Sequence, residues 1–517
     1  MYLFKIIAVS VCLIMISHSA FADDIDAFLR DKMKEMDIPG LQIAVVKNDK
    51  IIKSASYGIA NIQNMVAVDN ETVFNLASIT KAFTSVAVMQ LVEHGKVILN
   101  SAISNYIEDL PQSWQQITVN QLLSHTSGLP NIMNQHFQLI DSDGEEQSWK
   151  ALLQKELLFT PGSAFHYNQT NYLLIGRIIK RVSGKSYSTL IKKHQLNKVS
   201  MNKTVDAGFA HFENVNVHQA RDYRKNKQEQ LTNVLTYFPT IIRAGAGMSS
   251  NAKELANWAI ALQNGAFFED ENSLSKLWKV PPLTSNDWAK KNPNMHPYAL
   301  GWYLVNRPLN KKIVSAGGGQ SAIAVYPDDD LSIILLTNLA GSNPEGLMDE
   351  LAEFYLENFG LTANIKLLKS ILQKNNYEQI IKTASALSNS QNIIFDANEL
   401  HHFGELLNKQ GKTKQATQVF NLNNQLFSKL NLATQSLDEF IGEYKLEGFT
   451  INVSKNGNAL FITATNDATL PIFSVSHSRF ILKAVEASIT FKKDENARIN
   501  GLILNLNDQD LFGKKLR

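Results

Sequence analysis

A serine and a lysine stand one helical turn apart at the start of a long apolar stretch. Ser78 and Lys81 open a segment that is apolar on most sides and stops at Gly95. This pattern predicts a buried helix from Ser78 to about Glu93. At a spacing of i, i+3 the two side chains share one face of its first turn. Burial lowers the pKa of a lysine, so Lys81 could accept the proton of a Ser78 nucleophile.

The serine–lysine spacing is a weak signal on its own. The same S-x-x-K pattern recurs at Ser250–Lys253 and at Ser273–Lys276, where we interpret it as a chance match. Other parts of the chain must therefore decide whether Ser78 and Lys81 form a catalytic pair or another chance match.

Polar side chains also border two other helix patterns. Tyr167, Asn168 and Gln169 directly precede a buried helix pattern and could be held over a pocket. The alternative is an ordinary helix entry in which Asn168 or Thr170 is the N-cap. His125 ends a shorter helix pattern, and we expect it to bond the backbone there rather than to act in catalysis.

Two glycine-rich stretches interrupt the remaining patterns. Residues 244–250 (Ala-Gly-Ala-Gly-Met-Ser-Ser) precede a helix pattern but lack the Gly-Lys-Ser/Thr of a phosphate loop. Residues 315–321 (Ser-Ala-Gly-Gly-Gly-Gln-Ser) lie between two strand patterns. Glycines in strands often mark the close approach of a ligand or of another backbone segment.

The first 22 residues have the features of a targeting segment. Lys5 precedes an apolar run at residues 6–16, and residues 20–22 (Ala-Phe-Ala) form a small-x-small cleavage signal. We expect cleavage after Ala22 and a secreted, periplasmic or extracellular protein; the alternative is an uncleaved N-terminal anchor. The only cysteine, Cys12, lies in this segment, so the mature chain would have no disulfide or cysteine metal site.

Composition sets broad limits. The chain has 517 residues, enough for two or three domains, and is 44% hydrophobic. Its formal net charge is +2, and no stretch is basic enough to predict nucleic-acid binding. After removal of residues 1–22, no apolar run has the roughly 20 residues that a membrane-spanning helix needs.

Periodicity divides the mature chain into three parts. Residues 23–359 contain an N-terminal hairpin pattern, several helices and a late group of strands, which predicts one α/β domain. Residues 360–432 are helical and look tetratricopeptide-like. Residues 433–517 alternate like the short strands of a small β-barrel-like domain. One or two helical repeats seldom form a binding groove, so we favour a packing spacer over a partner-binding module.

The order of the motifs resembles that of the serine β-lactamase-related hydrolases. This is the branch that contains class C β-lactamases, D-aminopeptidases and penicillin-binding-protein-like carboxylesterases. The motifs are S-x-x-K at 78–81, L-L-S-H-T-S-G-L-P at 122–130, P-G-x-x-F-x-Y-x-x-x-N-Y at 161–172, A-G-x-G-M-x-S at 244–250, a glycine-rich strand run at 315–321, a P-D turn at 327–328 and L-L-T-N at 335–338. The resemblance covers residues 23–359. It implies an antiparallel sheet flanked by helices, with an all-helical lobe beside it.

Roles follow from the resemblance by position. It implies that Ser78 is the nucleophile, that Lys81 is its base or proton relay, and that Tyr167 is a general acid/base. Lys81 would have to lower the pKa of this tyrosine. The backbone N–H groups of Ser78 and Gly319 would form the oxyanion hole.

Two substrate-binding positions depart from the family pattern. Gln169 replaces the usual asparagine of the tyrosine motif. Ala316, followed by Gly317 and Gly318, occupies the position at which the family usually has Lys or His. The absent basic residue argues against efficient turnover of β-lactams or D-Ala-D-Ala peptides, because those substrates carry a carboxylate. It is compatible with neutral ester or amide substrates.

The sequence therefore predicts an exported serine hydrolase that acts through a Ser78 acyl-enzyme on small amide, D-peptide or ester substrates. An esterase or peptidase is favoured over a class C-like β-lactamase or DD-peptidase. The alternative is a weak or inactive protein that keeps the penicillin-recognising fold for binding or regulation. No metal or organic cofactor, no nucleic acid and no membrane span after residue 22 are expected. A partner for the C-terminal parts is left open.

Overall fold

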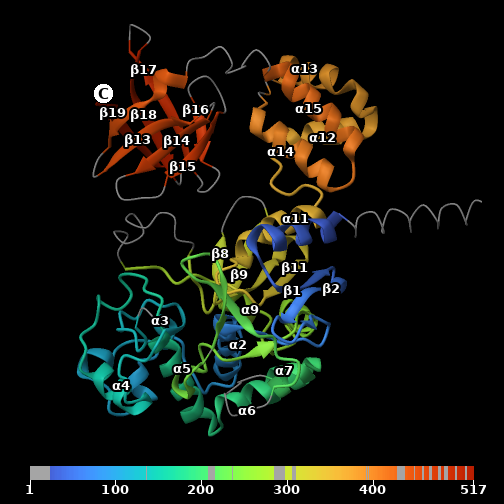
Figure 1. The fold of residues 1–517 in the computed structure, drawn as a ribbon. Coiled ribbons are helices and arrows are strands. Elements are labelled where there is room, and N and C mark those ends of the chain that lie inside the picture. Colours follow the sequence, from blue (N-terminus) through green and yellow to red (C-terminus); the bar gives the residue numbers. More distant parts are fainter. Residues whose placement is uncertain are drawn as a thin grey trace, which may run out of the picture. The chain divides into compact units, whose positions relative to one another are not determined.

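The structure is a computed structural model that describes residues 24–516 with short gaps. The gaps are residues 135–136, 208–215, 236, 285–296, 306–309, 392, 394, 428–436, 447–448, 457–458, 465–468, 475–478, 483–486, 495–497 and 507–508. The predicted targeting segment and Cys12 lie outside the described residues. The chain divides into two compact units, one ending at Leu356 and the other beginning at Glu357 (Figure 1).

One seven-stranded antiparallel sheet forms the centre of the first unit. Its strands are β1 (Gly40–Lys47), β2 (Lys50–Asn61), β3 (Val66–Ala67), β8 (Tyr303–Val305), β9 (Lys312–Gly317), β10 (Ser321–Tyr326) and β11 (Leu331–Thr337). They lie in the order β3-β2-β1-β11-β10-β9-β8. The N-terminal hairpin is thus joined to the late strands through β1 and β11, which pair along their whole length. Strand β8 is short and begins at Tyr303.

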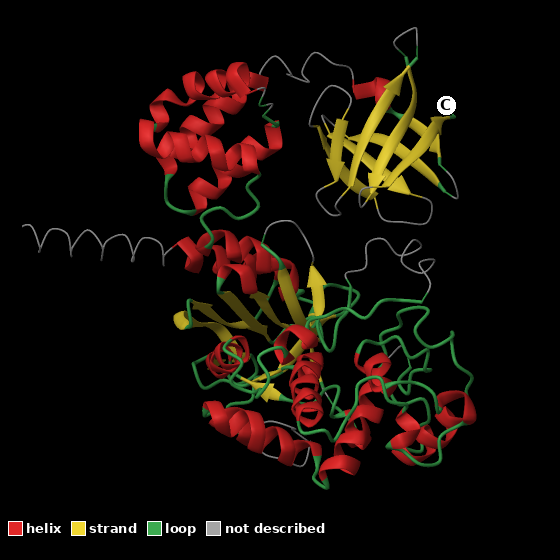
Figure 2. Cartoon of the chain, turned by 180° about the vertical axis from the view of Figure 1, so that it is seen from behind, coloured by secondary structure: helices red, strands yellow, loops and turns green. Residues whose placement is uncertain are grey.

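Helices cover both faces of this sheet (Figure 2). Besides an N-terminal helix at residues 24–36, they are α2 (Thr80–Glu93), α3 (Val119–Leu123), α4 (Glu145–Leu153), α5 (Gln169–Ser183), α6 (Tyr187–Ile191), α7 (Asn202–Ala207), α8 (Ala252–Gln263), α9 (Ser273–Leu277) and α11 (Met348–Tyr355). Helix α8 packs on β1, β2 and β11, and α11 packs on β11. Helix α2 packs against α5, α6 and α9 within the main apolar core, which explains why it is apolar almost all round.

The described residues of the second unit form four α-helices and a barrel. The helices are α12 (Ala363–Asn375), α13 (Ile380–Gln391), α14 (Ala397–Lys409) and α15 (Thr413–Phe427). Helices α14 and α15 form a helix–turn–helix pair, and Gly411 in the turn between them has a φ of +70°. Whether these helices form a tetratricopeptide-like module stays a prediction.

Eight antiparallel strands close the C-terminal barrel. They are β12 (Gly442–Lys445), β13 (Thr450–Asn456), β14 (Ala459–Ala464), β15 (Thr469–Ser474), β16 (Arg479–Leu482), β17 (Ala487–Lys493), β18 (Ile499–Leu506) and β19 (Gln509–Lys515). Pairing of β12 with β19 completes the ring. The predicted fold class, a helix-flanked antiparallel sheet followed by a small β domain, is therefore confirmed.

Candidate active site

Ser78 lies in a tight turn that lifts it out of the core. The turn is the 3₁₀-helix η1 (Ala77–Ile79), so α2 itself begins slightly later than predicted. Ala77 has a φ of +42°, and its N–H bonds the Asn75 side chain at 2.9 Å. From Thr72 to Met89 every residue is buried except Ser78. A strained turn that exposes one hydroxyl is a common feature of functional sites.

Lys81 is fully buried directly below Ser78. Its Nζ lies 3.3 Å from Ser78 Oγ, 3.1 Å from Gln169 Oε1 and 2.8 Å from the Gly245 carbonyl oxygen. All three groups are uncharged, so nothing in this shell repays the cost of burying an ammonium group. Burial accordingly lowers the pKa of Lys81 to about 7.

The three contacts of Lys81 fit a neutral amine. A neutral lysine has two N–H donors and one lone pair, whereas an ammonium has three donors. Gly245 and Gln169 offer acceptors for the two N–H groups. The lone pair is then free to accept from the Ser78 hydroxyl, which is the contact that a general base needs.

Tyr167 completes the polar cluster. Its ring centre lies 4.8 Å from Lys81 Nζ, and its hydroxyl shares a hydrogen bond with the Ser78 side chain. Although the residue is partly exposed, burial of the hydroxyl raises the pKa of Tyr167 well above 10, and Tyr303 adds to this. The expectation that Lys81 would lower this pKa is therefore wrong. Lys81 and not Tyr167 changes charge near neutral pH.

Gln169 turns its carbonyl oxygen toward Lys81. It is the first residue of α5, whose N-cap is Asn168, as the capping alternative predicted. Its backbone N–H donates to Asn131 Oδ1 at 3.1 Å, which fixes this entry to the helix. In this geometry Gln169 holds the lysine, and its expected contact with substrate stays a prediction.

The register of β9 corrects one predicted substrate position. Ser315 pairs with Ile323 of β10, and this row contributes to the core that contains α2. Ala316 pairs with Ala322, and because side chains alternate along a strand its side chain points to the opposite face. Ser315, rather than Ala316, thus occupies the position that faces the Ser78 side of the sheet.

Gly317 lies on the same face of β9 as Ser315 and contacts the turn that contains Ser78. A Cβ atom at Gly317 would lie 2.0 Å from the Leu76 carbonyl oxygen and 2.9 Å from the Ser78 nitrogen. Only glycine permits this approach, which brings the end of β9 to the backbone of Ser78. The glycine run was predicted to mark a close approach, and at Gly317 the group that approaches is the backbone of Leu76 and Ser78.

The two glycines after Gly317 form the turn into β10. Gly318 and Gly319 have φ values of +62° and +61°, and the Gln320 N–H donates to the Gly317 carbonyl oxygen at 3.0 Å. These are the features of a type I′ turn. The turn begins beside the Ser78 nitrogen, and the oxyanion role of Gly319 stays a prediction.

Gly245 is a site residue that the sequence interpretation did not single out. A Cβ atom there would lie 2.8 Å from Gln169 Oε1 and 3.4 Å from Lys81 Nζ. Any side chain would therefore disturb the two groups that hold the lysine. Gly245 is the second residue of the A-G-x-G-M-x-S motif, and that motif was the only feature of the sequence that could have indicated it. A glycine has no reactive side-chain atom, so its residue type alone does not predict a role in a site.

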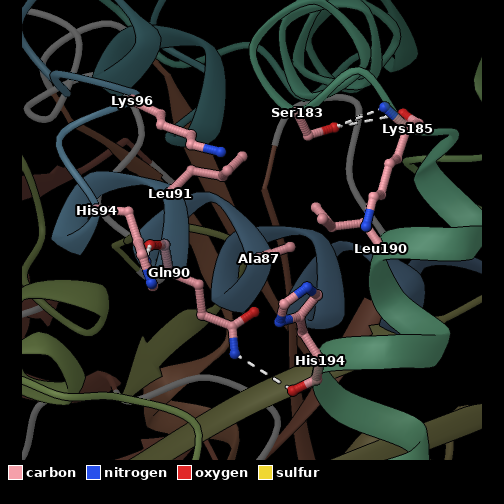
Figure 3. A pocket seen from close by; sticks show the side chains of 9 residues that line it. All are labelled: Ala87, Gln90, Leu91, His94, Lys96, Ser183, Lys185, Leu190 and His194. Atoms are coloured by element: carbon pink, nitrogen blue, oxygen red, sulfur yellow. Dashed lines mark hydrogen bonds between the residues drawn. The ribbon is translucent and has the colours of Figure 1, made fainter.

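A hollow lies near the C-terminal end of α2, away from Ser78. It has a volume of about 110 Å³, and Figure 3 shows the residues that line it: Ala87, Gln90, Leu91, His94, Lys96, Ser183, Lys185, Leu190 and His194. Gln90 bonds the His194 carbonyl oxygen at 3.4 Å. Lys96 and Lys185 are exposed, so their charges are solvated.

Two histidines in the second unit bond separate partners. His401 Nε2 lies 3.1 Å from Glu405 Oε1, whereas His402 Nε2 lies 2.9 Å from the Phe359 carbonyl oxygen. Within the described ranges, no three His, Cys, Asp or Glu side chains gather as a metal site would require. In that same part of the chain, no helix combines the length and apolarity needed to cross a membrane.

Comparisons with known proteins show the family to which the chain belongs. Residues 25–356 match the protein-family model described as Beta-lactamase. The chain therefore belongs to the β-lactamase family, whose members are generally serine hydrolases, and it has homologues among penicillin-binding proteins. Its specific branch within the family is not fixed by the match.

Individual relatives are distant. Protein flp of Staphylococcus aureus (strain MW2) is 27% identical over 338 residues, 63% of this chain and 65% of that protein, so the match spans just under two-thirds of the relative. Penicillin-binding protein 4* of Bacillus subtilis (strain 168) is 24% identical over 476 residues, covering 88% of this chain and 90% of that protein. The octameric penicillin-binding protein homologue from Pyrococcus abyssi shares the fold, with a TM-score of 0.55, 20% identity, and coverage of 95% of this chain and 100% of that one.

Proposed function

We propose that this chain is an exported serine hydrolase that acts through an acyl-enzyme on Ser78. The observation that carries the proposal is the shell of Lys81: three uncharged contacts, one of which is the Ser78 hydroxyl. A lysine with a pKa of about 7 is substantially neutral at physiological pH and can act as a base.

Acylation would proceed in three proton transfers. Ser78 Oγ attacks the substrate carbonyl carbon while its proton passes to Lys81 Nζ. Tyr167 then donates its hydroxyl proton to the leaving oxygen or nitrogen, and the Lys81 ammonium returns a proton to Tyr167. The raised pKa of Tyr167 suits a donor that stays protonated until this moment. Water then hydrolyses the acyl-enzyme by the reverse transfers.

Backbone groups would stabilise the charge that develops on the carbonyl oxygen. The Ser78 N–H lies in the first turn of η1, where an N–H has no acceptor within its own helix. The turn at Gly318 and Gly319 begins beside it, and we propose Gly319 as the second donor. Two such donors are commonly worth several kcal/mol of transition-state stabilisation.

The uncharged face of β9 supports small neutral substrates. Ser315 faces the Ser78 side of the sheet, and Ala316 stands where the resemblance expects a lysine or histidine. Both are uncharged, so no cation on the Ser78 face of β9 would attract a substrate carboxylate. We therefore favour small esters, amides or D-peptides whose recognised group is neutral. An esterase or peptidase fits this better than a class C-like β-lactamase or DD-peptidase.

The same feature supports a second candidate function. A chain without the β9 cation could keep the penicillin-recognising fold as a weak or inactive binding or regulatory protein. The intact arrangement of Ser78, Lys81 and Tyr167 favours the hydrolase. The two candidates differ in one observable, the covalent reactivity of Ser78.

Intact-protein mass spectrometry tests the proposal. The protein is incubated with a fluorophosphonate and, separately, with a penicillin, alongside Ser78→Ala. We expect a fluorophosphonate adduct on the wild type that is absent from Ser78→Ala. A persistent penicillin adduct would instead indicate a penicillin-binding peptidase. Correctly folded wild-type protein that reacts with neither reagent would exclude the hydrolase and favour the binding protein.

Export is a separate proposal. It rests on the apolar run and the small-x-small signal of residues 1–22. We expect the mature chain to begin at Asp23 and to reside in the periplasm or outside the cell, with the second unit serving as a tetratricopeptide-like spacer and a barrel domain. The mass of the protein recovered from its native host distinguishes a chain that starts at Asp23 from an uncleaved one.

A further inference from the structure

His125 is tied to the residues on both sides of Tyr167. Its carbonyl oxygen accepts the His166 N–H at 2.9 Å. Its ring nitrogen Nδ1 lies 3.4 Å from the Asn168 N–H and 2.8 Å from Asn171 Nδ2. One buried residue thus fastens the backbone immediately before and immediately after the tyrosine that contacts Ser78.

The backbone of His125 is shaped for this double attachment. Its φ is +59°, a conformation that few residues other than glycine adopt. This turn follows α3 directly and presents both the carbonyl and the ring to the 166–168 segment. Such a costly conformation persists only where the surrounding contacts over-determine it.

The hydrogen bonds fix which nitrogen carries the proton. The Asn168 N–H can only donate, so Nδ1 must be the acceptor and Nε2 must carry the hydrogen of the neutral ring. Asn171 agrees with this assignment, because its Oδ1 accepts from Ser127 at 2.5 Å and leaves its amino group facing His125. A proton on Nδ1 would oppose two donors at once.

The other nitrogen faces aromatic rings. Among the described residues Nε2 is buried without a hydrogen-bond partner. The ring centres of Tyr167, Tyr298 and Tyr172 lie 4.2, 5.0 and 5.3 Å from that of His125. Burial, reinforced by the charges of Lys81 and His166, lowers the pKa of His125 well below 6.5. The ring therefore stays neutral over the working pH range.

We propose that His125 is a positioning residue for the proposed reaction, which holds the Tyr167 hydroxyl against Ser78 through its carbonyl oxygen and its Nδ1 acceptor. The inference rests on the proposed function but adds a residue to it. It assigns His125 neither base nor nucleophile chemistry, because it acts only through Tyr167.

Two substitutions separate the acceptor from the backbone shape. Asparagine and glycine both tolerate a φ of +59°, but only His125→Asn keeps a side-chain acceptor near the place of Nδ1. We expect His125→Gly to lower the rate constant of Ser78 labelling by a fluorophosphonate about tenfold or more, and His125→Asn to lower it about threefold or less. Thermal melting of both variants confirms that each compared protein is folded.

A double-mutant cycle tests whether His125 acts through Tyr167. Labelling rates are measured for the wild type, His125→Gly, Tyr167→Phe and the double variant. If His125 only positions the tyrosine, His125→Gly has no further effect, within about twofold, once Tyr167 is phenylalanine. Losses that multiply in the double variant, or a wild-type rate in His125→Gly, would overturn the inference.

The pH profile and the ring nitrogens give independent readouts. Lys81, His166, Tyr167, Tyr172 and Tyr298 are the titratable groups that face His125. Because Lys81 is the one that titrates near neutrality, the His125 variants should keep the wild-type midpoint and change only the plateau. Nitrogen NMR of histidine-labelled protein should show an Nε2–H tautomer from pH 5.5 to 9. A shifted midpoint or a titrating ring contradicts the inference, whereas wild-type protein that never labels contradicts the proposed function itself.

Discussion

Two buried lysines, one in each unit, are treated very differently by their surroundings. Lys81 meets the uncharged groups of Ser78, Gln169 and Gly245. Lys369 bonds the Glu357 carbonyl oxygen at 2.9 Å and also forms an ion pair with the Glu357 carboxylate at 3.3 Å. Both have lowered pKa values because of burial, but at Lys369 the carboxylate opposes the shift.

The comparison teaches that burial alone does not make a base. A buried lysine with a carboxylate partner keeps its proton and works as a structural cation. A buried lysine with only neutral acceptors gains by losing its proton, and it then presents a lone pair. In this chain that lone pair faces Ser78, which carries the one partly exposed hydroxyl between Thr72 and Met89.

The largest effect is expected when Lys81, like Lys369, is given a carboxylate partner. Gln169→Glu should raise the pKa of Lys81 by about one to three units, because a nearby negative charge favours the ammonium form. Fluorophosphonate labelling of Ser78 at pH 7 should then fall about 10- to 100-fold and recover toward pH 9. Glu357→Gln, a matched change beside Lys369, should leave the rate unaltered. An unchanged midpoint in Gln169→Glu would refute the role given to the neutral shell.

A cation placed on the site face of β9 should sharpen substrate recognition. Ser315→Lys is expected to increase the rate of penicillin acylation about tenfold relative to the fluorophosphonate rate, the value of one favourable charge contact. Ala316→Lys is the control, since residue 316 points to the other face of the sheet. An equal gain from both variants, measured by stopped-flow or intact mass, would contradict the observed register.

The lowered pKa of Lys81 should also make the free energy of unfolding depend on pH. Between pH 7 and 10.5 the folded state has released the Lys81 proton while the unfolded chain still binds it, so the free energy of unfolding rises with pH. From pH 6 to pH 9 the wild type should gain about 2–3 kcal/mol from this residue, and Lys81→Met should lack the gain. Relative to Lys81→Met, the melting temperature of the wild type should therefore rise with pH; a constant difference between the two proteins would speak against a neutral Lys81.

The smallest effect is expected at the other lysine. Lys369→Met leaves Glu357 paired with Lys412 at 2.9 Å, and that carboxylate is half exposed. The substitution should cost about 1 kcal/mol of stability or less and should leave Ser78 labelling within error of the wild type. A large loss of labelling would show that Lys369 is more than a structural cation.

The contact between Ser78 and Lys81 could be predicted from their spacing in the sequence. Ser78 and Lys81 meet because i, i+3 residues share a helical face, and apolar neighbours correctly indicated that the lysine is buried. Their meeting with Tyr167 was predicted only through the resemblance. The pKa of Tyr167 was predicted in the wrong direction, because the burial of its hydroxyl depends on residues distant in sequence.

Neither the register of β9 nor the role of Gly245 could be predicted from the sequence. The run Ser-Ala-Gly-Gly-Gly has no alternation of polar and apolar side chains, so it could not fix which residue of β9 faces Ser78. Gly245 contributes only its carbonyl oxygen, which accepts from Lys81, and its lack of a side chain, which leaves room for Gln169 and Lys81.

The pH dependence of Ser78 labelling tests the central claim most directly. The rate constant for fluorophosphonate addition is measured by intact mass from pH 5 to 9, with Ser78→Ala as the blank. The account predicts an adduct on Ser78 whose rate rises with pH through a midpoint near 7, where Lys81 loses its proton. A rate that does not change between pH 5 and 9, or folded protein that is not labelled at all, would contradict it.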